Sequence, residues 1–187
     1  MRLKRQCVYL FLLIILLVCN SCSNLETITV VWPTYLVNMT RYTAEQQVEL
    51  INKSNEDNKY ANTVYANEDG SITIEMNAKQ LQNNKGKFIK YMDEIIEEAG
   101  ENEITINVSD DYKELTFEFS RMVDANVFVG TLASASCNVV VLQMLLGENP
   151  DDWHLNIKYI NSDTGNVIKE GTIPDEELNL SPEDWEE

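Results

Sequence analysis

Cys137 and His154 are the residue types that could pair as a nucleophile and its general base, because a nearby imidazole activates a thiol. His154 is the only histidine, and Cys137 is the only cysteine after residue 22. Cys137 lies in an apolar stretch, 133–139, where a buried thiol is normally inert. We therefore expect no cysteine catalysis. Because zinc needs three or four such ligands, we also expect no metal and no cofactor.

Two acidic turn sequences imitate functional motifs. Residues 65–70 have the spacing of a calcium loop, but Tyr65 and Met76 occupy the positions where that loop requires oxygen ligands. The triplet Asp163-Thr164-Gly165 matches that of aspartic proteases, whose chemistry needs a second carboxylate on a paired lobe. The chain has no second copy of the triplet. Both sequences predict hairpin turns.

Four lysines, Lys79, Lys85, Lys87 and Lys90, lie in the first part of a predicted helix over 77–100, and its acids lie in the last part. This order is the opposite of what the helix dipole favours. One interpretation is a candidate docking patch for an anionic wall polymer or lipid headgroup. The other is a solvated face in which Lys90 pairs with Asp93 and Glu94, which is the commoner outcome for a run of charges.

The elements that position these residues follow from hydrophobic periodicity and turn chemistry. A first strand is expected over 27–32, and a short helix opens at a capping box of Thr43 and Gln46. A second capping box, Asn77 with Gln80, opens the helix that Gly100 should end. Alternating segments predict three hairpins, and a long apolar helix is expected from Arg121 to Leu146; the hairpins cover 62–76, 104–119 and 155–173. Hairpins interleaved with helices predict an α+β fold, a mainly antiparallel sheet with two main helices packed on one face.

Three stretches carry a resemblance to a known family: ANTVYANEDGSITIEMNAKQLQ, INVSDDYKELTFEF and IKYINSDTGNVIKEG. They resemble a family of small clostridial, Gram-positive surface lipoproteins of unknown function, over about residues 60–173. The shared features are turns and core strands. Relatives often carry a Gln-His pair in the helix, whereas Leu81 follows Gln80 here, so the resemblance implies no site built on that histidine.

The N-terminus has the order of a secretory signal: Arg2, Lys4 and Arg5, then an apolar run over 8–18, then small and polar residues. The run is too short to cross a bilayer, which takes about 20 residues. The cysteine at its exit resembles a type II bacterial lipoprotein signal and predicts lipidation of Cys22, with Cys19 as the alternative. We expect residues 1–21 to be a signal peptide and 22–26 a lipid-anchor linker. One domain over 27–173 and an acidic, mobile tail over 174–187 should follow.

Charge excludes one class of partner. The chain carries a formal net charge of −17, and three of its 14 basic residues lie in the predicted signal. Nucleic acid is excluded because polyanion binding needs a basic footprint. Residues 127–146 contain no charge, and their small and polar residues favour a buried core helix over an interaction or membrane helix.

These observations predict a lipid-anchored protein on the extracytoplasmic face of the bacterial cell membrane. It would act as a non-catalytic binding or envelope-associated module, and an envelope protein or a wall polymer is its expected partner. Two alternatives remain open. One is a cell-envelope hydrolase that uses an Asp/Glu pair, and the other is an accessory subunit of a membrane complex.

Overall fold

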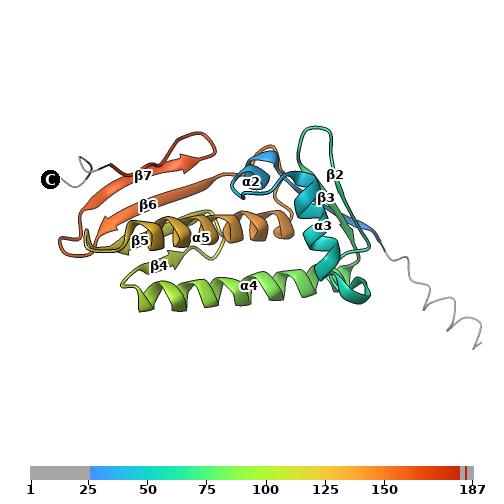
Figure 1. The fold of residues 1–187 in the computed structure, drawn as a ribbon, viewed down its shortest axis with the longest axis horizontal. Helices are drawn as coiled ribbons and strands as arrows, with labels where there is room; N and C mark the ends of the chain where they lie inside the picture. Colours follow the sequence, from blue (N-terminus) through green and yellow to red (C-terminus); the bar gives the residue numbers. More distant parts are fainter. Residues whose placement is uncertain (1–25, 182–183, 185–187) are drawn as a thin grey trace, which may run out of the picture.

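The computed structural model describes residues 26–181 and 184, which form two β-sheets and several helices (Figure 1). This confirms the α+β class. The elements follow in the order β1 (Ile28–Trp32), α2 (Thr34–Asn38), α3 (Ala44–Ser54), η1 (Glu56–Asn58), β2 (Thr63–Ala66), β3 (Ile72–Met76), α4 (Ala78–Glu101), β4 (Thr105–Val108), β5 (Glu114–Phe119), α5 (Ala125–Leu146), β6 (Leu155–Asn161) and β7 (Val167–Ile173).

The first sheet has the strand order β1-β3-β2, with both pairings antiparallel. Its β2–β3 hairpin turns at Gly70, which takes the positive φ of 83° that the Asp-Gly sequence predicts. The carboxylate of Asp69 accepts from the backbone N–H of Ser71 at 2.9 Å and from its hydroxyl at 2.7 Å. These hydrogen bonds lower the pKa of Asp69. Its carboxylate therefore stabilises the turn, as the hairpin interpretation requires.

The second sheet has the order β4-β5-β6-β7 and contains one parallel pair, β5 with β6. The predicted hairpins β4–β5 and β6–β7 are confirmed. The prediction of a single sheet is not confirmed, because the strands divide into two sheets. The parallel pairing arises because α5 carries the chain from the end of β5 back to its start, as a parallel connection must.

The long helices α4 and α5 pack on one face of the second sheet. The ring of Phe128 in α5 lies 6.1 Å from Phe117 and stacks on Phe119 with 4.1 Å between centroids. The amide of Asn138 in α5 donates to the carbonyl of Phe88 in α4 at 2.9 Å. The two helices therefore form one layer that covers the buried face of the sheet.

The capping boxes of α3 and α4 are both present as predicted. Two other predicted helix ends were wrong. α4 continues through Gly100 and ends at Glu101. α5 begins at Ala125 rather than Arg121, because the side chain of Asp124 caps it by accepting two backbone N–H groups. Its C-terminal end at Gly147, with φ of 98°, agrees with the sequence.

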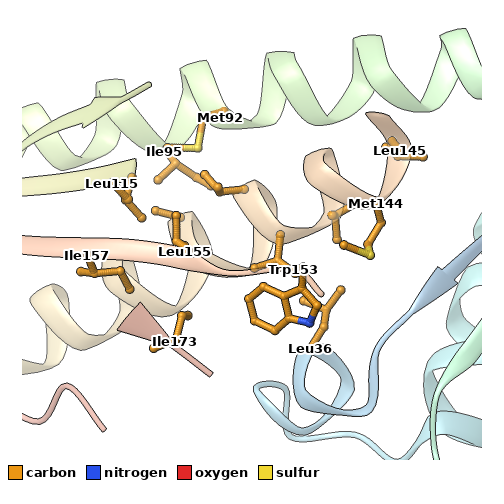
Figure 2. Close-up of a cluster of buried hydrophobic side chains, with 14 of the residues drawn as sticks. Leu36, Met92, Ile95, Leu115, Met144, Leu145, Trp153, Leu155, Ile157 and Ile173 are labelled. Carbon is orange, nitrogen blue, oxygen red and sulfur yellow. The ribbon is translucent and has the colours of Figure 1, made fainter. Parts of the chain in front are cut away.

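The core is continuous across both sheets. Figure 2 shows side chains from α4, α5 and the second sheet converging, with Trp153 and Leu36 at the border with the first part of the chain. The ring of Tyr35 lies 5.5 Å from that of Trp153. Trp32 of β1 meets Phe88 of α4 edge to face at 6.4 Å. The two sheets thus belong to a single domain.

Among the described residues, α5 is the one helix long and apolar enough to cross a membrane. More than half of its most apolar window, 56%, is buried in the domain. Its second half, from Val139 to Leu145, is buried throughout, whereas Val129 in its first half is 61% exposed. This is the burial of a core helix with one uncovered end.

The acidic segment after β7 differs from the expectation over residues 174–181. Leu178 and Leu180 pack against the core, and Tyr159 donates its hydroxyl to the carbonyl of Leu178 at 3.4 Å. Gly171 permits this approach, since a Cβ there would lie 2.5 Å from a carboxylate oxygen of Glu176. Two leucines spaced by two point to the same side of an extended segment. Their burial places the segment on the domain, although its acidic composition predicts a mobile tail.

Candidate functional site

The predicted lipidation sites, Cys22 and Cys19, lie outside the described residues. The four lysines of the candidate docking patch all lie on α4 but do not form one group. At 100° per residue, Lys79, Lys87 and Lys90 fall on the solvent side of the helix, whereas Lys85 falls on a flank more than a quarter turn away. Lys85 is also partly buried, while the other three are exposed.

A segment remote in sequence completes the patch. Residues 58–60 lie against the first turns of α4 because three amide side chains of that helix bind three successive backbone carbonyls. Gln80 donates to the carbonyl of Asn58 at 2.6 Å, Asn83 to that of Lys59 at 3.1 Å, and Asn84 to that of Tyr60 at 2.7 Å. Gln80 and Asn84 are almost fully buried. We call these three amides the amide ladder.

The amide ladder is possible because of the local backbone of 57–58. Asp57 and Asn58 both take positive φ, 53° and 52°, a conformation that Asn and Asp tolerate better than other non-glycine residues. This turn directs the carbonyls of the following residues toward α4. It therefore brings Lys59 and Tyr60 to the exposed side of α4.

The result is an open groove of about 550 Å³ between the 59–60 segment and α4. Gly86 lies in it without a side chain, and no heavy atom lies within 4 Å of the position that a Cβ would take there. The lining is basic and aromatic, with one acid at the edge: Lys59, Tyr60, Gln82, Asn83, Gly86, Lys87, Lys90, Tyr91 and Glu94. We call this the basic groove.

Two ammonium groups stand over one aromatic ring in the basic groove. Lys59 Nζ lies 5.1 Å and Lys87 Nζ 4.8 Å from the centroid of Tyr60, within cation–π range. The third lysine, Lys90, pairs with Glu94 at 2.7 Å, as the solvated-face interpretation predicts, and this hydrogen bond raises the pKa of Lys90. Lys59 and Lys87 have no carboxylate partner within the described part of the chain. The groove can therefore hold an anion beside an aromatic face.

The basic groove lies at the corner where the chain enters the domain. Ile28, at the start of β1, pairs with Met76 at the end of β3, and the cap of α4 follows at Asn77. The start of β2 pairs with the same end of β3, through Thr63 and Glu75. The entry of the chain, the 59–60 segment and the first turn of α4 are therefore neighbours.

Cys137 does not have the surroundings of a nucleophile. Its sulfur lies 4.0 Å from that of Met39, and no hydrogen bond within the described residues joins it to His154. Burial raises the pKa of Cys137 to about 11. Among the described residues no group of three or more His, Cys, Asp and Glu side chains is placed to hold a metal ion.

A second hollow, of about 500 Å³, lies on the second sheet and contains three carboxylates: Glu114, Glu170 and Glu176. Glu170 pairs with Lys158 at 3.0 Å, and Thr172 donates its hydroxyl to Asn156 at 2.7 Å beside them. These contacts join neighbouring strands across the sheet, as cross-strand pairs do on exposed faces.

The sequence prediction missed Lys59 and Tyr60. The signal that could have found them is the pair of amides Gln80 and Asn84, which is unusual on the buried side of an amphipathic helix. No family model matches the chain, and no curated protein or solved structure gives a significant match.

Proposed function

We propose that this chain is a lipid-anchored, extracytoplasmic surface protein whose basic groove binds an anionic ligand without chemistry on it. The observation that carries the proposal is the groove itself. It gathers ammonium groups and aromatic rings on a chain of net charge −17, and the amide ladder, in which Gln80 and Asn84 are buried, holds it together.

Three further features support this proposal. The groove contains no activated nucleophile, and the raised pKa of Cys137 opposes thiolate chemistry. The helix dipole disfavours lysines in the first turns of α4 and acids in its last, so helix stability does not account for this order. The corner that carries the groove is also where the chain comes from Cys22.

The anchor is tested by comparing Cys22→Ser with Cys19→Ser in a Gram-positive expression host. We expect the Cys22→Ser protein to lose its acyl mass in mass spectrometry and to leave the membrane fraction. Cys19→Ser is the matched control and should keep both. An unmodified thiol at Cys22 in the natural product, or a cytosolic location, contradicts the proposal.

Anion binding is tested by calorimetry with soluble polyphosphate. Lys87→Gln should weaken binding several-fold, since it removes one of two unpaired ammonium groups. Arg121→Gln makes the same charge change at the exposed residue between β5 and α5, at the other end of the long helices, and should leave the affinity nearly unchanged. Equal losses in the two variants would mean that net charge, and not the groove, governs binding.

A hydrolase remains the second candidate, because Glu114, Glu170 and Glu176 line one hollow. It predicts turnover of a wall glycan or peptide that Glu176→Gln abolishes while Glu177→Gln, the neighbouring exposed acid, does not. The ion pair of Glu170 with Lys158 fits a structural role for that carboxylate better, and we rank this candidate below the binding protein.

A further inference from the structure

We infer that the ligand of the basic groove is the phosphate of anionic lipid headgroups in the same membrane that holds the anchor, and that this contact fixes the orientation of the domain. The inference rests on the proposed lipid anchor. It names the ligand of the groove and the orientation of the domain relative to the membrane.

The first argument is the length of the connection. Four residues, 23–26, separate Cys22 from Thr27, the residue before β1, and they reach at most about 14 Å. Ile28 then pairs with Met76, one residue before the cap of α4. A lipid on Cys22 therefore holds the first turn of α4 near the headgroups, within reach of a lysine side chain.

The second argument is the distribution of charge along α4. Between Ala78 and Met92 the helix carries four lysines and no acid, and between Asp93 and Glu101 it carries acids and no lysine. The centres of the two groups lie roughly 18 Å apart at 1.5 Å per residue. That separation exceeds the screening length of about 8 Å at physiological salt. An anionic surface attracts the lysine end, whereas the acids beyond Glu94, which itself pairs with Lys90 at the edge of the groove, lie farther from it.

The third argument is the chemistry of the lining. Lys59 and Lys87 flank the ring of Tyr60, and Tyr91 is 47% exposed beside them. Tyrosine is enriched where headgroups meet water, and lysine extends its ammonium group toward phosphate while its stem covers apolar surface. Glu56 and Asp57 precede Lys59 and lower the local charge, so attraction depends mainly on the lysines of α4.

The fourth argument is the remainder of the molecule. With its signal removed, the chain keeps all 31 acids, which anionic lipid repels. A domain with a uniform surface would be held away from the membrane at the end of its tether. The lysine end of α4 carries the densest run of basic residues in the described part of the chain, so it faces the membrane and the far end of α4 points outward.

The experiment uses the lipidated protein purified from membranes and reconstituted into vesicles. The vesicles contain phosphatidylcholine alone or phosphatidylcholine partly replaced by phosphatidylglycerol. Acetylation rates of individual lysines are measured by mass spectrometry. We expect Lys59 and Lys87 to react about fivefold more slowly in the anionic vesicles, the effect of one surface-bound lysine. Lys158, on the second sheet, should react equally in both.

Three controls separate the outcomes. About 1 M salt, which shortens the screening length to about 3 Å, should remove the protection. Lys87→Gln should reduce the protection of Lys59, and Arg121→Gln should not. A soluble polyglycerol phosphate is the competing source of the same phosphate chemistry, and we expect it to protect Lys59 and Lys87 far less than the vesicles do.

The results that overturn the inference are distinct. If the protein carries its acyl mass and Lys59 is acetylated equally in both kinds of vesicle, the headgroup contact is refuted and the anchor is not. Protection by the soluble polymer equal to that by vesicles places the ligand in the wall. Absence of the acyl mass removes the anchor, and the inference falls with it.

Discussion

Gln80 offers the sharpest test of how the candidate site is assembled, because one side chain serves two purposes. Its Oε1 accepts the backbone N–H of Asn77 at 2.7 Å and completes the capping box. Its Nε2 donates to the carbonyl of Asn58 at 2.6 Å and to Asn62 Oδ1 at 2.9 Å. Gln80→Glu keeps the first function and replaces the donor with an oxygen that faces two acceptors.

We expect this substitution to lower the free energy of unfolding by about 2 kcal/mol at pH 7. Two hydrogen bonds are lost at about 1 kcal/mol each. Repulsion between the new carboxylate and the Asn58 carbonyl adds to the loss, and the helix dipole offsets roughly 0.5 kcal/mol of it. In urea the midpoint should fall by about 1 M, given a slope near 2 kcal/mol/M.

The matched control is Gln46→Glu in the capping box of α3. Gln46 Oε1 accepts from the N–H of Thr43 at 3.0 Å, and within the described residues its side chain donates to no backbone carbonyl. It should therefore change the midpoint little. A Gln80→Glu protein whose midpoint matches that of Gln46→Glu would refute the claim that the amide ladder holds the 59–60 segment.

The loss in Gln80→Glu should also depend on pH. The two acceptors favour the protonated acid, so the folded state raises the pKa of the introduced carboxyl group above its unfolded value of about 4.3. A raised folded pKa means that stability falls as pH rises through it. The difference from the unmodified chain should be largest near neutral pH and shrink toward about pH 4, where the protonated acid can donate one bond.

Three other predictions address the rest of the molecule. Gly171→Ala should release the 174–181 segment, because its Cβ would lie 2.7 Å from a methyl carbon of Leu178, and hydrogen exchange should rise there but not in β5; unchanged exchange would contradict the packing. Asp124→Ala should destabilise the protein by about 1 kcal/mol through loss of the α5 cap, measured by urea denaturation, whereas Asp151→Ala should cost little. Burial raises the pKa of Cys137 to about 11, so the thiol should be alkylated about a hundredfold faster in urea than in the native protein at pH 8. Equal alkylation rates in the two states would show that the native thiol is accessible. The free energy of unfolding should also fall as pH rises from about 8.5 toward 11, because the thiol loses its proton first in the unfolded state.

Local signals predicted much of this fold. The capping boxes at Thr43 and Asn77 and the Asp69-Gly70 turn each involve residues within four positions, so one stretch of sequence contains the whole cause. The division into two sheets depends on pairings between distant strands, such as Ile28 with Met76, and periodicity does not specify them. The parallel pair could have been expected from a strand, a 22-residue helix and a strand in succession.

The candidate site was predictable in part for the same reason. The lysines of α4 are visible as a run, but Lys59 joins them only through backbone carbonyls that Asn83 and Asn84 reach across 24 positions. Composition likewise misjudged residues 174–181. Leu178 and Leu180 decide the placement of this segment although acids outnumber them. The free energy gained by burying two leucine side chains exceeds the conformational entropy that the exposed acidic residues lose.

The two buried amides of α5 have a consequence for how that helix fits its surroundings. A helix that is apolar on nearly every side has little preference for which side faces inward, since rotating or sliding it exchanges one hydrocarbon contact for another. Asn138 reaches one carbonyl of α4, and Gln143 reaches those of Tyr112 and His154 at 2.6 and 3.0 Å. A shift of one turn would leave these donors facing hydrocarbon. The two amides therefore fix both the rotation of α5 about its axis and its position along that axis.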